Sequence, residues 1–117
     1  MAAVALNTFK TIRSNITNGY VGIYTCPIGV ASIVLLAQVT NVSTGSTTYT
    51  VSAVHSRSTE ATQDYEFSKE TSVPANDSIN LIPDGKLALE TGDVIKIKAS
   101  ANDVLNIILS VLETAKN

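Results

Sequence analysis

The sequence predicts an all-β protein: a single-domain antiparallel β-sandwich of about nine strands with a jelly-roll-like arrangement. Short segments of alternating apolar residues are separated by turn sequences, of which 73–77, 83–85, 91–93 and 101–103 are the clearest. The 117 residues also have the length of one domain, which buries roughly two thirds of the surface that its unfolded chain exposes. We therefore expect a short N-terminal arm at residues 1–8 and a sandwich domain at residues 9–117.

Residues 1–8 contain small apolar side chains and no turn sequence, which is typical of an arm that docks onto a neighbouring molecule. Residues 9–16 follow as a strand, with Ile12 and Ile16 on one face and Arg13 on the other. Asn18 and Gly19 both tolerate positive φ, so they predict a hairpin that joins this strand to a second strand at residues 20–26.

The most apolar segment is residues 31–42, and both of its faces are apolar at the start. Strict alternation places Ile33, Leu35 and Ala37 on one face and Val34 and Leu36 on the other. An antiparallel strand with one solvated face alternates more cleanly. Residues 33–36 are therefore expected either to be covered twice within the domain or to lie at a subunit contact.

The second half continues as extended segments at residues 47–57, 65–73, 78–82, 86–90 and 94–100, with the polar residues 58–64 expected as an exposed loop. In the last of these strands Ile95 and Ile97 should face inward while Lys96 and Lys98 face solvent. Residues 104–113 fit a helical stripe as well as a strand, and their β-branched content favours the strand.

Composition favours a protein that contacts other proteins. Charged residues make up 15% of the chain, against roughly 25% in an average soluble domain, and hydrophobic residues make up 44%. The net charge is −2 and the basic residues are scattered, which argues against direct nucleic-acid binding. Apolar runs are far shorter than the roughly 20 residues that a membrane-spanning helix needs, and no membrane partner is expected.

No residue pattern predicts catalysis, a cofactor or a metal. The single cysteine, Cys26, is expected to be a buried thiol at a strand end, and the single histidine, His55, an exposed strand residue. A Cys26–His55 dyad would lack a third, orienting residue. The acidic residues do not have the spacing of a calcium loop, and one cysteine with one histidine cannot supply a structural zinc site. We expect a protein that is not an enzyme.

Five sequence stretches resemble small virion structural proteins of tailed bacteriophages, including cyanophages. They are IYTCPIG (23–29), IVLLAQVTNV (33–42), VPANDS (73–78), GKLALETGD (85–93) and SVLE (110–113), and the resemblance covers roughly residues 20 to 114. It implies capsid decoration, in which the protein cements the assembled phage head, or alternatively a tail, neck or fibre-associated module that contacts a host receptor or other tail proteins.

The resemblance to decoration proteins implies two kinds of partner, the major capsid protein and further copies of this chain in a dimer or trimer. It also implies a place on the outer capsid surface of the virion after synthesis in the host cytoplasm. From the residue pattern we expect the contacts to involve Ala2, Ala3, Val4, Leu6, Phe9, Val34, Leu36 and Tyr49.

Overall fold

The structure is a computed structural model, and it describes residues 7–57, 64–83 and 85–115. These residues form nine strands and no helix. The strands are β1 (Asn7–Asn15), β2 (Val21–Thr25), β3 (Val30–Asn41), β4 (Tyr49–Ser56), β5 (Tyr65–Val73), β6 (Ser78–Asn80), β7 (Leu87–Leu89), β8 (Val94–Ala99) and β9 (Leu105–Ala115).

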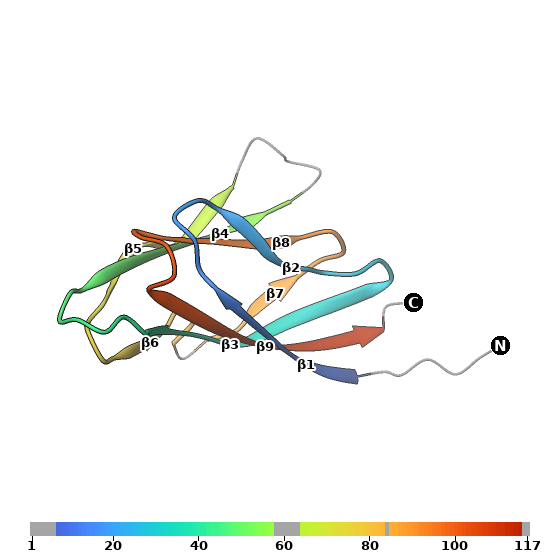
Figure 1. The fold of residues 1–117 in the computed structure, drawn as a ribbon. Helices are drawn as coiled ribbons and strands as arrows, with labels where there is room; N and C mark the ends of the chain where they lie inside the picture. Colours follow the sequence, from blue (N-terminus) through green and yellow to red (C-terminus); the bar gives the residue numbers. More distant parts are fainter. Residues whose placement is uncertain (1–6, 58–63, 84, 116–117) are drawn as a thin grey trace.

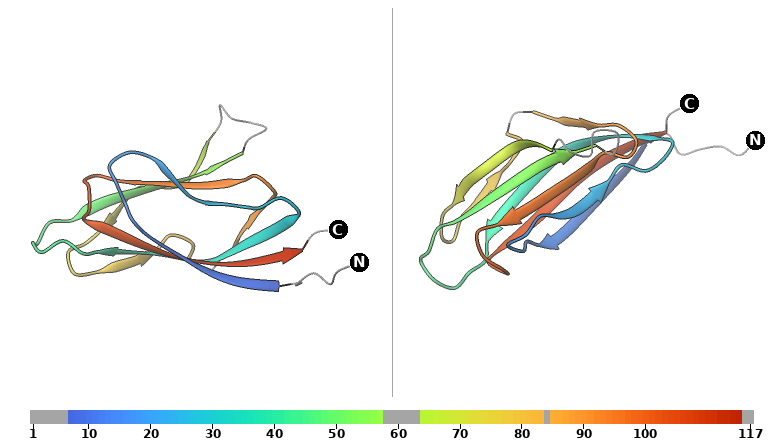
Figure 2. Two further views of the ribbon diagram at one scale, coloured as in Figure 1. Left: turned by 45° about the vertical axis from the view of Figure 1, so that its right-hand side comes forward. Right: turned by 90° about the horizontal axis from the view of Figure 1, so that it is seen from above.

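The strands form two antiparallel sheets that lie face to face (Figures 1 and 2). The five-stranded sheet has the order β1-β9-β3-β6, with β7 paired to another part of β3, and the four-stranded sheet has the order β2-β8-β4-β5. Strands β1 to β4 alternate between the two sheets, and strands β7 to β9 do the same. This connectivity is a jelly roll, so the predicted fold class is confirmed.

The hydrophobic core lies between the sheets and follows the alternation of each strand. Ile95, Ile97 and Ala99 of β8 point into it, opposite the inward residues of β9, which are Leu105, Ile107, Leu109 and Val111. Burying one such aliphatic side chain contributes roughly 1.5–3 kcal/mol. The alternation predicted for residues 94–100 is confirmed, and so is the choice of a strand over a helix at the C-terminal end.

The predicted turns use residues that accept positive φ. Between β5 and β6, Asn76 has a φ of 61° and the Asp77 N–H donates to the Pro74 carbonyl at 3.2 Å. Between β7 and β8, Gly92 has a φ of 88° and directly precedes the buried Asp93. Left-handed backbone is sterically costly for residues with a Cβ, so Asn and Gly are selected here.

The hairpin predicted for the first two strands is wrong. β1 pairs with β9 and β2 pairs with β8, so the two strands lie in different sheets and residues 16–20 cross between them. The Asn18 N–H donates to Asn102 Oδ1 at 2.8 Å, which ties this crossing to the β8–β9 turn. Turn chemistry reports a change of direction, and it does not show whether the chain returns in the same sheet.

The predicted faces of β3 are also wrong over part of its length. The register with β9 shifts between Val34 and Leu36, so Leu35 occupies a β-bulge. Val34 and Ala37 therefore both point into the core, and Ile33 and Leu36 both point outward. One extra residue reverses the alternation on one side of it, because side chains alternate with a period of two.

Two predictions fall largely outside the described residues. Of the predicted arm, residues 1–6 are not described, while residues 7 and 8 form the start of β1. Of the loop predicted at residues 58–64, only Asp64 is described, and its carboxylate lies 3.6 Å from Lys96 Nζ.

Candidate interaction surface

The outer surface of the five-stranded sheet carries a contiguous group of apolar side chains. We call it the apolar face and define it as Phe9, Ile33, Leu36, Ile108 and Leu112. In the strand register Phe9 is opposite Leu112, and Leu112 is opposite Ile33, so these three form one row across β1, β9 and β3. Leu36 pairs with Ser110 in the next row, and Ile108 lies one row further on.

The burial of these residues shows that they point away from the core. Their strand neighbours Val34 and Val111 are buried in the hydrophobic core, whereas no member of the apolar face belongs to that core or packs against it. The Phe9 side chain is 74% exposed and Ile108 is 44% exposed. Ile33, Leu36 and Leu112 are partly exposed. Apolar groups that lie together on a surface in this way are typical of protein–protein contact sites.

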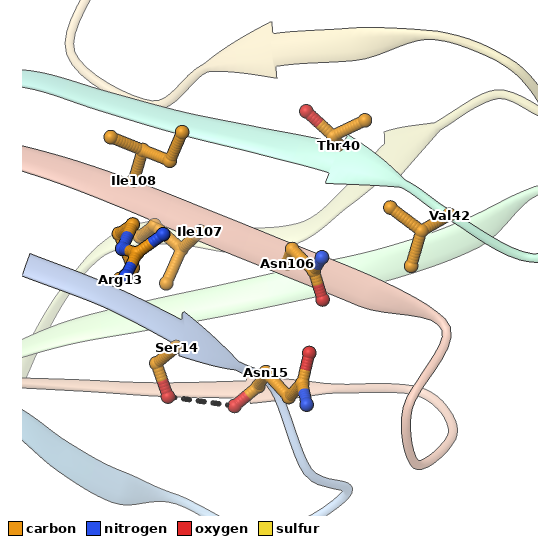
Figure 3. A pocket seen from close by; sticks show the side chains of 8 residues that line it. All are labelled: Arg13, Ser14, Asn15, Thr40, Val42, Asn106, Ile107 and Ile108. Atoms are coloured by element: carbon orange, nitrogen blue, oxygen red, sulfur yellow. Dashed lines mark hydrogen bonds between the residues drawn. The ribbon is translucent and has the colours of Figure 1, made fainter.

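A shallow groove with a mixed polar and apolar lining continues the same outer surface toward the β8–β9 turn (Figure 3). Its volume is about 730 Å³, and Arg13 and Asn15 of β1, Asn106 of β9 and Thr40 of β3 line it. The Asn106 Oδ1 atom is buried and accepts no hydrogen bond within the described part of the chain. An unpaired buried acceptor of this kind is costly to stability.

The outer surface of the four-stranded sheet is polar. Lys96 and Lys98 of β8 alternate with the core residues of that strand, and they carry their charges to this surface. Lys96 Nζ lies 3.6 Å from an Asp64 carboxylate oxygen, and Lys98 Nζ lies 4.8 Å from the centroid of the Tyr20 ring. The two outer surfaces of the sandwich therefore differ in chemistry.

A buried carboxylate lies at one end of the four-stranded sheet. Asp93 is fully buried and accepts hydrogen bonds from His55 Nε2 at 2.9 Å, from Arg57 Nε at 2.8 Å and from the Glu90 N–H at 2.9 Å. Arg57 Nη2 also donates to Asp93 at 2.9 Å and to Glu90 at 3.1 Å. These contacts fasten the β7–β8 turn to the end of β4.

The Arg57 guanidinium holds the pKa of the Asp93 carboxyl well below its usual range, and it outweighs burial, which acts in the opposite direction. The Glu90 N–H and His55 lower the pKa further. A carboxylate that stays ionised and receives this many donors is well suited to holding strands together.

The sequence did not predict this cluster, and one expectation about it is wrong. His55 is not an exposed strand residue, because its side chain is 19% exposed and bonded to Asp93. The signal was His55 near the end of a strand and Arg57 two positions later, with an acidic residue in a turn far along the chain. Only the β4–β8 pairing brings them together.

A second polar cluster joins the two sheets. Tyr24 of β2 donates from its hydroxyl to Glu113 of β9 at 2.5 Å, and the same hydroxyl lies 2.7 Å from Ser32 Oγ of β3. Lys10 Nζ lies 3.2 Å from the other Glu113 oxygen. Burial raises the pKa of Tyr24 above its ordinary value, and the hydrogen bond to Glu113 raises it further.

Cys26 is buried at the end of β2, as predicted, and its thiol lies 3.2 Å from Ser32 Oγ. Cys26 and His55 thus have different hydrogen-bond partners. In the described part of the chain no three His, Cys, Asp or Glu side chains are grouped so that they could hold a metal ion. Over the same residues no helix is long and apolar enough to cross a membrane.

The interface residues predicted from the sequence have different positions in the structure. Phe9 and Leu36 lie on the apolar face. Val34 is fully buried between the sheets, so its prediction as an interface residue is wrong. The bulge at Leu35 places Val34 and Leu36 on opposite faces of the strand. Tyr49 is half-buried and packs against the core. Ala2, Ala3, Val4 and Leu6 lie outside the described residues.

Comparison with known proteins shows the fold. No family model and no curated protein matches the sequence. A solved structure of a protein from Bacillus endospore appendages, described as a family of disulfide-linked pili, is similar to this chain with a TM-score of 0.54 and 12% identity. The match covers all of this chain and 98% of that one. A chain from the acid-stable capsid structure of Helicobacter pylori bacteriophage KHP30 is similar with a TM-score of 0.48 and 15% identity, covering 97% and 90% of the two chains. At these identities the likeness concerns the fold alone.

Proposed function

We propose that this protein is a non-enzymatic virion structural protein, a capsid decoration protein that binds the assembled phage head and stabilises it. The observation that carries the proposal is the difference between the two outer surfaces. One presents the apolar face, and the other presents lysines and hydroxyl groups. A protein that lies on a shell needs this asymmetry, because one side contacts the shell and the other contacts water.

The apolar face is suited to a protein partner. Its row of Phe9, Leu112 and Ile33 supplies the apolar centre that protein interfaces require, while Arg13 and Asn106, further along the same surface, supply polar groups at the rim. The resemblance of the sequence to phage virion proteins supports the same partner.

The stabilising effect follows from mass action. A protein that binds only the assembled shell stabilises it by RT ln(1 + [L]/Kd) at each site, where L is the free decoration protein. At a concentration of 100 times Kd this is about 2.7 kcal/mol per site. Because a shell repeats the site many times, a modest affinity is enough to strengthen it, and no covalent chemistry is needed.

The experiment measures binding of the purified protein to heads that lack it. Ile108→Lys places a charge at the end of the apolar face that borders the groove, at a side chain that is already partly exposed, so the fold should survive. We expect binding to weaken at least about tenfold, because the lysine must be desolvated in the contact. The matched control is Ser72→Lys, at an exposed position of β5 in the four-stranded sheet, which should bind like the unmodified protein.

The result that would contradict the proposal is equal binding by the Ile108 variant and the unmodified protein. Loss of binding by the Ser72 variant alone would assign the contact to the other sheet and would also overturn it. A tail, neck or fibre-associated role remains the alternative function, and it predicts no binding of the unmodified protein to tailless heads.

A further inference from the structure

The outermost strand of the five-stranded sheet, β1, has a free edge that is long and regular. Its pairing with β9 runs from Asn7 opposite Thr114 to Asn15 opposite Asn106 without a register shift. The other edge strands in the described part of the chain are interrupted or short. β2 has a shift between Gly22 and Tyr24, β5 has two shifts against β4, and β6 and β7 have three residues each. Bulges and shortness protect sheet edges from pairing, and β1 has neither device.

The backbone groups that β1 presents at this edge follow from one hydrogen bond to β9. The Ile16 N–H donates to the Leu105 carbonyl at 2.9 Å, so Ile16 directs its backbone toward β9. Consecutive residues of an antiparallel strand direct their backbone groups to opposite sides. The even-numbered residues of β1 therefore bond to β9, and Asn7, Phe9, Thr11, Arg13 and Asn15 direct their N–H and C=O groups to the free edge.

We propose that two copies of this protein pair through β1, antiparallel about a two-fold axis at Thr11, and so join their five-stranded sheets into one continuous sheet. In this register the edge-directed residues of one strand meet those of the other, as a hydrogen-bonded ladder requires. Phe9 then lies opposite the partner's Arg13, and Lys10 lies opposite the partner's Ile12. The inference concerns self-association and goes beyond the proposed binding to the capsid.

The side chains select this register over its neighbours. An axis at Lys10 would place Lys10 opposite the partner's Lys10, and an axis at Arg13 would do the same for the arginines, and like charges directly opposite each other are destabilising. An axis at Ile12 leaves Asn7 and Thr8 outside the pairing. The axis at Thr11 pairs the whole of β1 and opposes no like charges.

The pairing also covers Phe9, the aromatic side chain of the apolar face. Phe9 is 74% exposed in the single chain, and Phe9 and Arg13 both lie on the outer surface of the sheet. Directly opposite residues of adjacent strands are close enough for the guanidinium to lie over the ring, a contact that is favourable within about 6 Å. The two-fold axis repeats this contact, and it brings the two apolar faces together on one side of the joined sheet.

Disulfide trapping tests the register directly. Thr11→Cys should form a disulfide-linked dimer on mild oxidation, because hydrogen-bonded pairs have a Cα separation of about 5.5 Å, within the range that disulfides accept. Phe9→Cys alone and Arg13→Cys alone should stay largely unlinked, and a mixture of the two should cross-link. The matched control is Thr44→Cys, an exposed threonine in the β3–β4 loop, and the native Cys26 is buried and should stay unlinked.

A charge exchange tests the same contacts without a covalent bond. Phe9→Lys opposes the partner's Arg13 at two places per dimer, and it should weaken dimerisation at least about tenfold in sedimentation measurements. Adding Arg13→Glu should restore the dimer, since each lysine then faces a glutamate. Circular dichroism and thermal unfolding check that each variant is folded, which is expected at such exposed positions.

Several results would overturn the proposal. They are a monomeric unmodified protein up to about 1 mM, equal cross-linking of Thr11→Cys and Thr44→Cys, self-linking of Phe9→Cys that exceeds the mixture, or a double charge variant as monomeric as Phe9→Lys. None of these experiments contains capsid, so their failure is distinguishable from failure of the proposed function.

Discussion

Replacing Asp93 by asparagine tests how the buried carboxylate holds the end of the sandwich. The substitution keeps the shape of the side chain and removes its charge. Asp93 Oδ2 accepts hydrogen bonds from His55, Arg57 and the Glu90 N–H. An asparagine NH₂ group at that position would direct its own N–H bonds at these donor groups. If the amide is turned over, the Arg57 Nε bond to Oδ1 is lost instead.

The size of the effect can be worked out from these contacts. A hydrogen bond to a charged group contributes about 1.5–3 kcal/mol. In either orientation of the amide the bonds from His55 and the Glu90 N–H lose their charged acceptor, and we count about 1.5 kcal/mol for each. Arg57 is one third exposed and can hydrate, so its bonds are not counted. The free energy of unfolding should fall by about 3 kcal/mol, in line with removing one partner of a buried ion pair. This is a large fraction of the 5–15 kcal/mol that stabilises a domain.

The pH dependence provides a second measurement of the same effect. Because the pKa of Asp93 is lowered in the folded state, the unfolded chain binds the proton first, and the stabilisation present at neutral pH is lost as the pH falls below about 4. The difference in unfolding free energy between the unmodified protein and Asp93→Asn should therefore shrink in acid.

The assay is urea unfolding at pH 7 and at successively lower pH. Asp103→Asn is the matched control, since Asp103 is exposed and its φ of 60° suits asparagine, and it should change stability by less than about 0.5 kcal/mol. A loss below about 1 kcal/mol for Asp93→Asn at pH 7, or a difference that stays constant in acid, would refute this account of the cluster.

Two further predictions concern single positions. Gly92→Ala should lower the free energy of unfolding by about 1–2 kcal/mol because of its φ of 88°, whereas Gly19→Ala, where an added Cβ meets no atom within 4 Å, should be close to neutral in the same urea titration. Tyr24→Phe should cost about 1–3 kcal/mol through the lost hydrogen bonds to Glu113 and Ser32. The raised pKa of Tyr24 makes the unmodified protein lose stability as the pH rises above about 10, and that part of the loss should be absent from Tyr24→Phe, so equal alkaline profiles would contradict the assignment.

The sequence predicted much of the fold because alternation and turn residues are local signals. The strand at β9 was correctly preferred over a helix, since Leu105, Ile107, Leu109 and Val111 alternate with outward residues over its whole length. The same reasoning failed at Leu35, because a bulge is a single extra residue with no composition of its own.

Pairing between distant segments was beyond local reasoning. Asn18 and Gly19 do form a change of direction, yet the chain continues into the opposite sheet, so the predicted hairpin was wrong. The contact between Asp93, His55 and Arg57 likewise depends on β4 and β8 being neighbours. The apolar face was predicted only in part, since Phe9 and Leu36 were among the expected contact residues while Ile33, Ile108 and Leu112 were not.

The measurement that tests the central claim most directly is the copy number of this protein relative to the major capsid protein in purified particles, by quantitative mass spectrometry. If the apolar face binds a site that repeats over the shell, the number of copies of this protein should be a simple fraction of the number of copies of the major capsid protein. A few copies per particle, or none, would contradict a decoration role, and a few copies would favour the tail or neck.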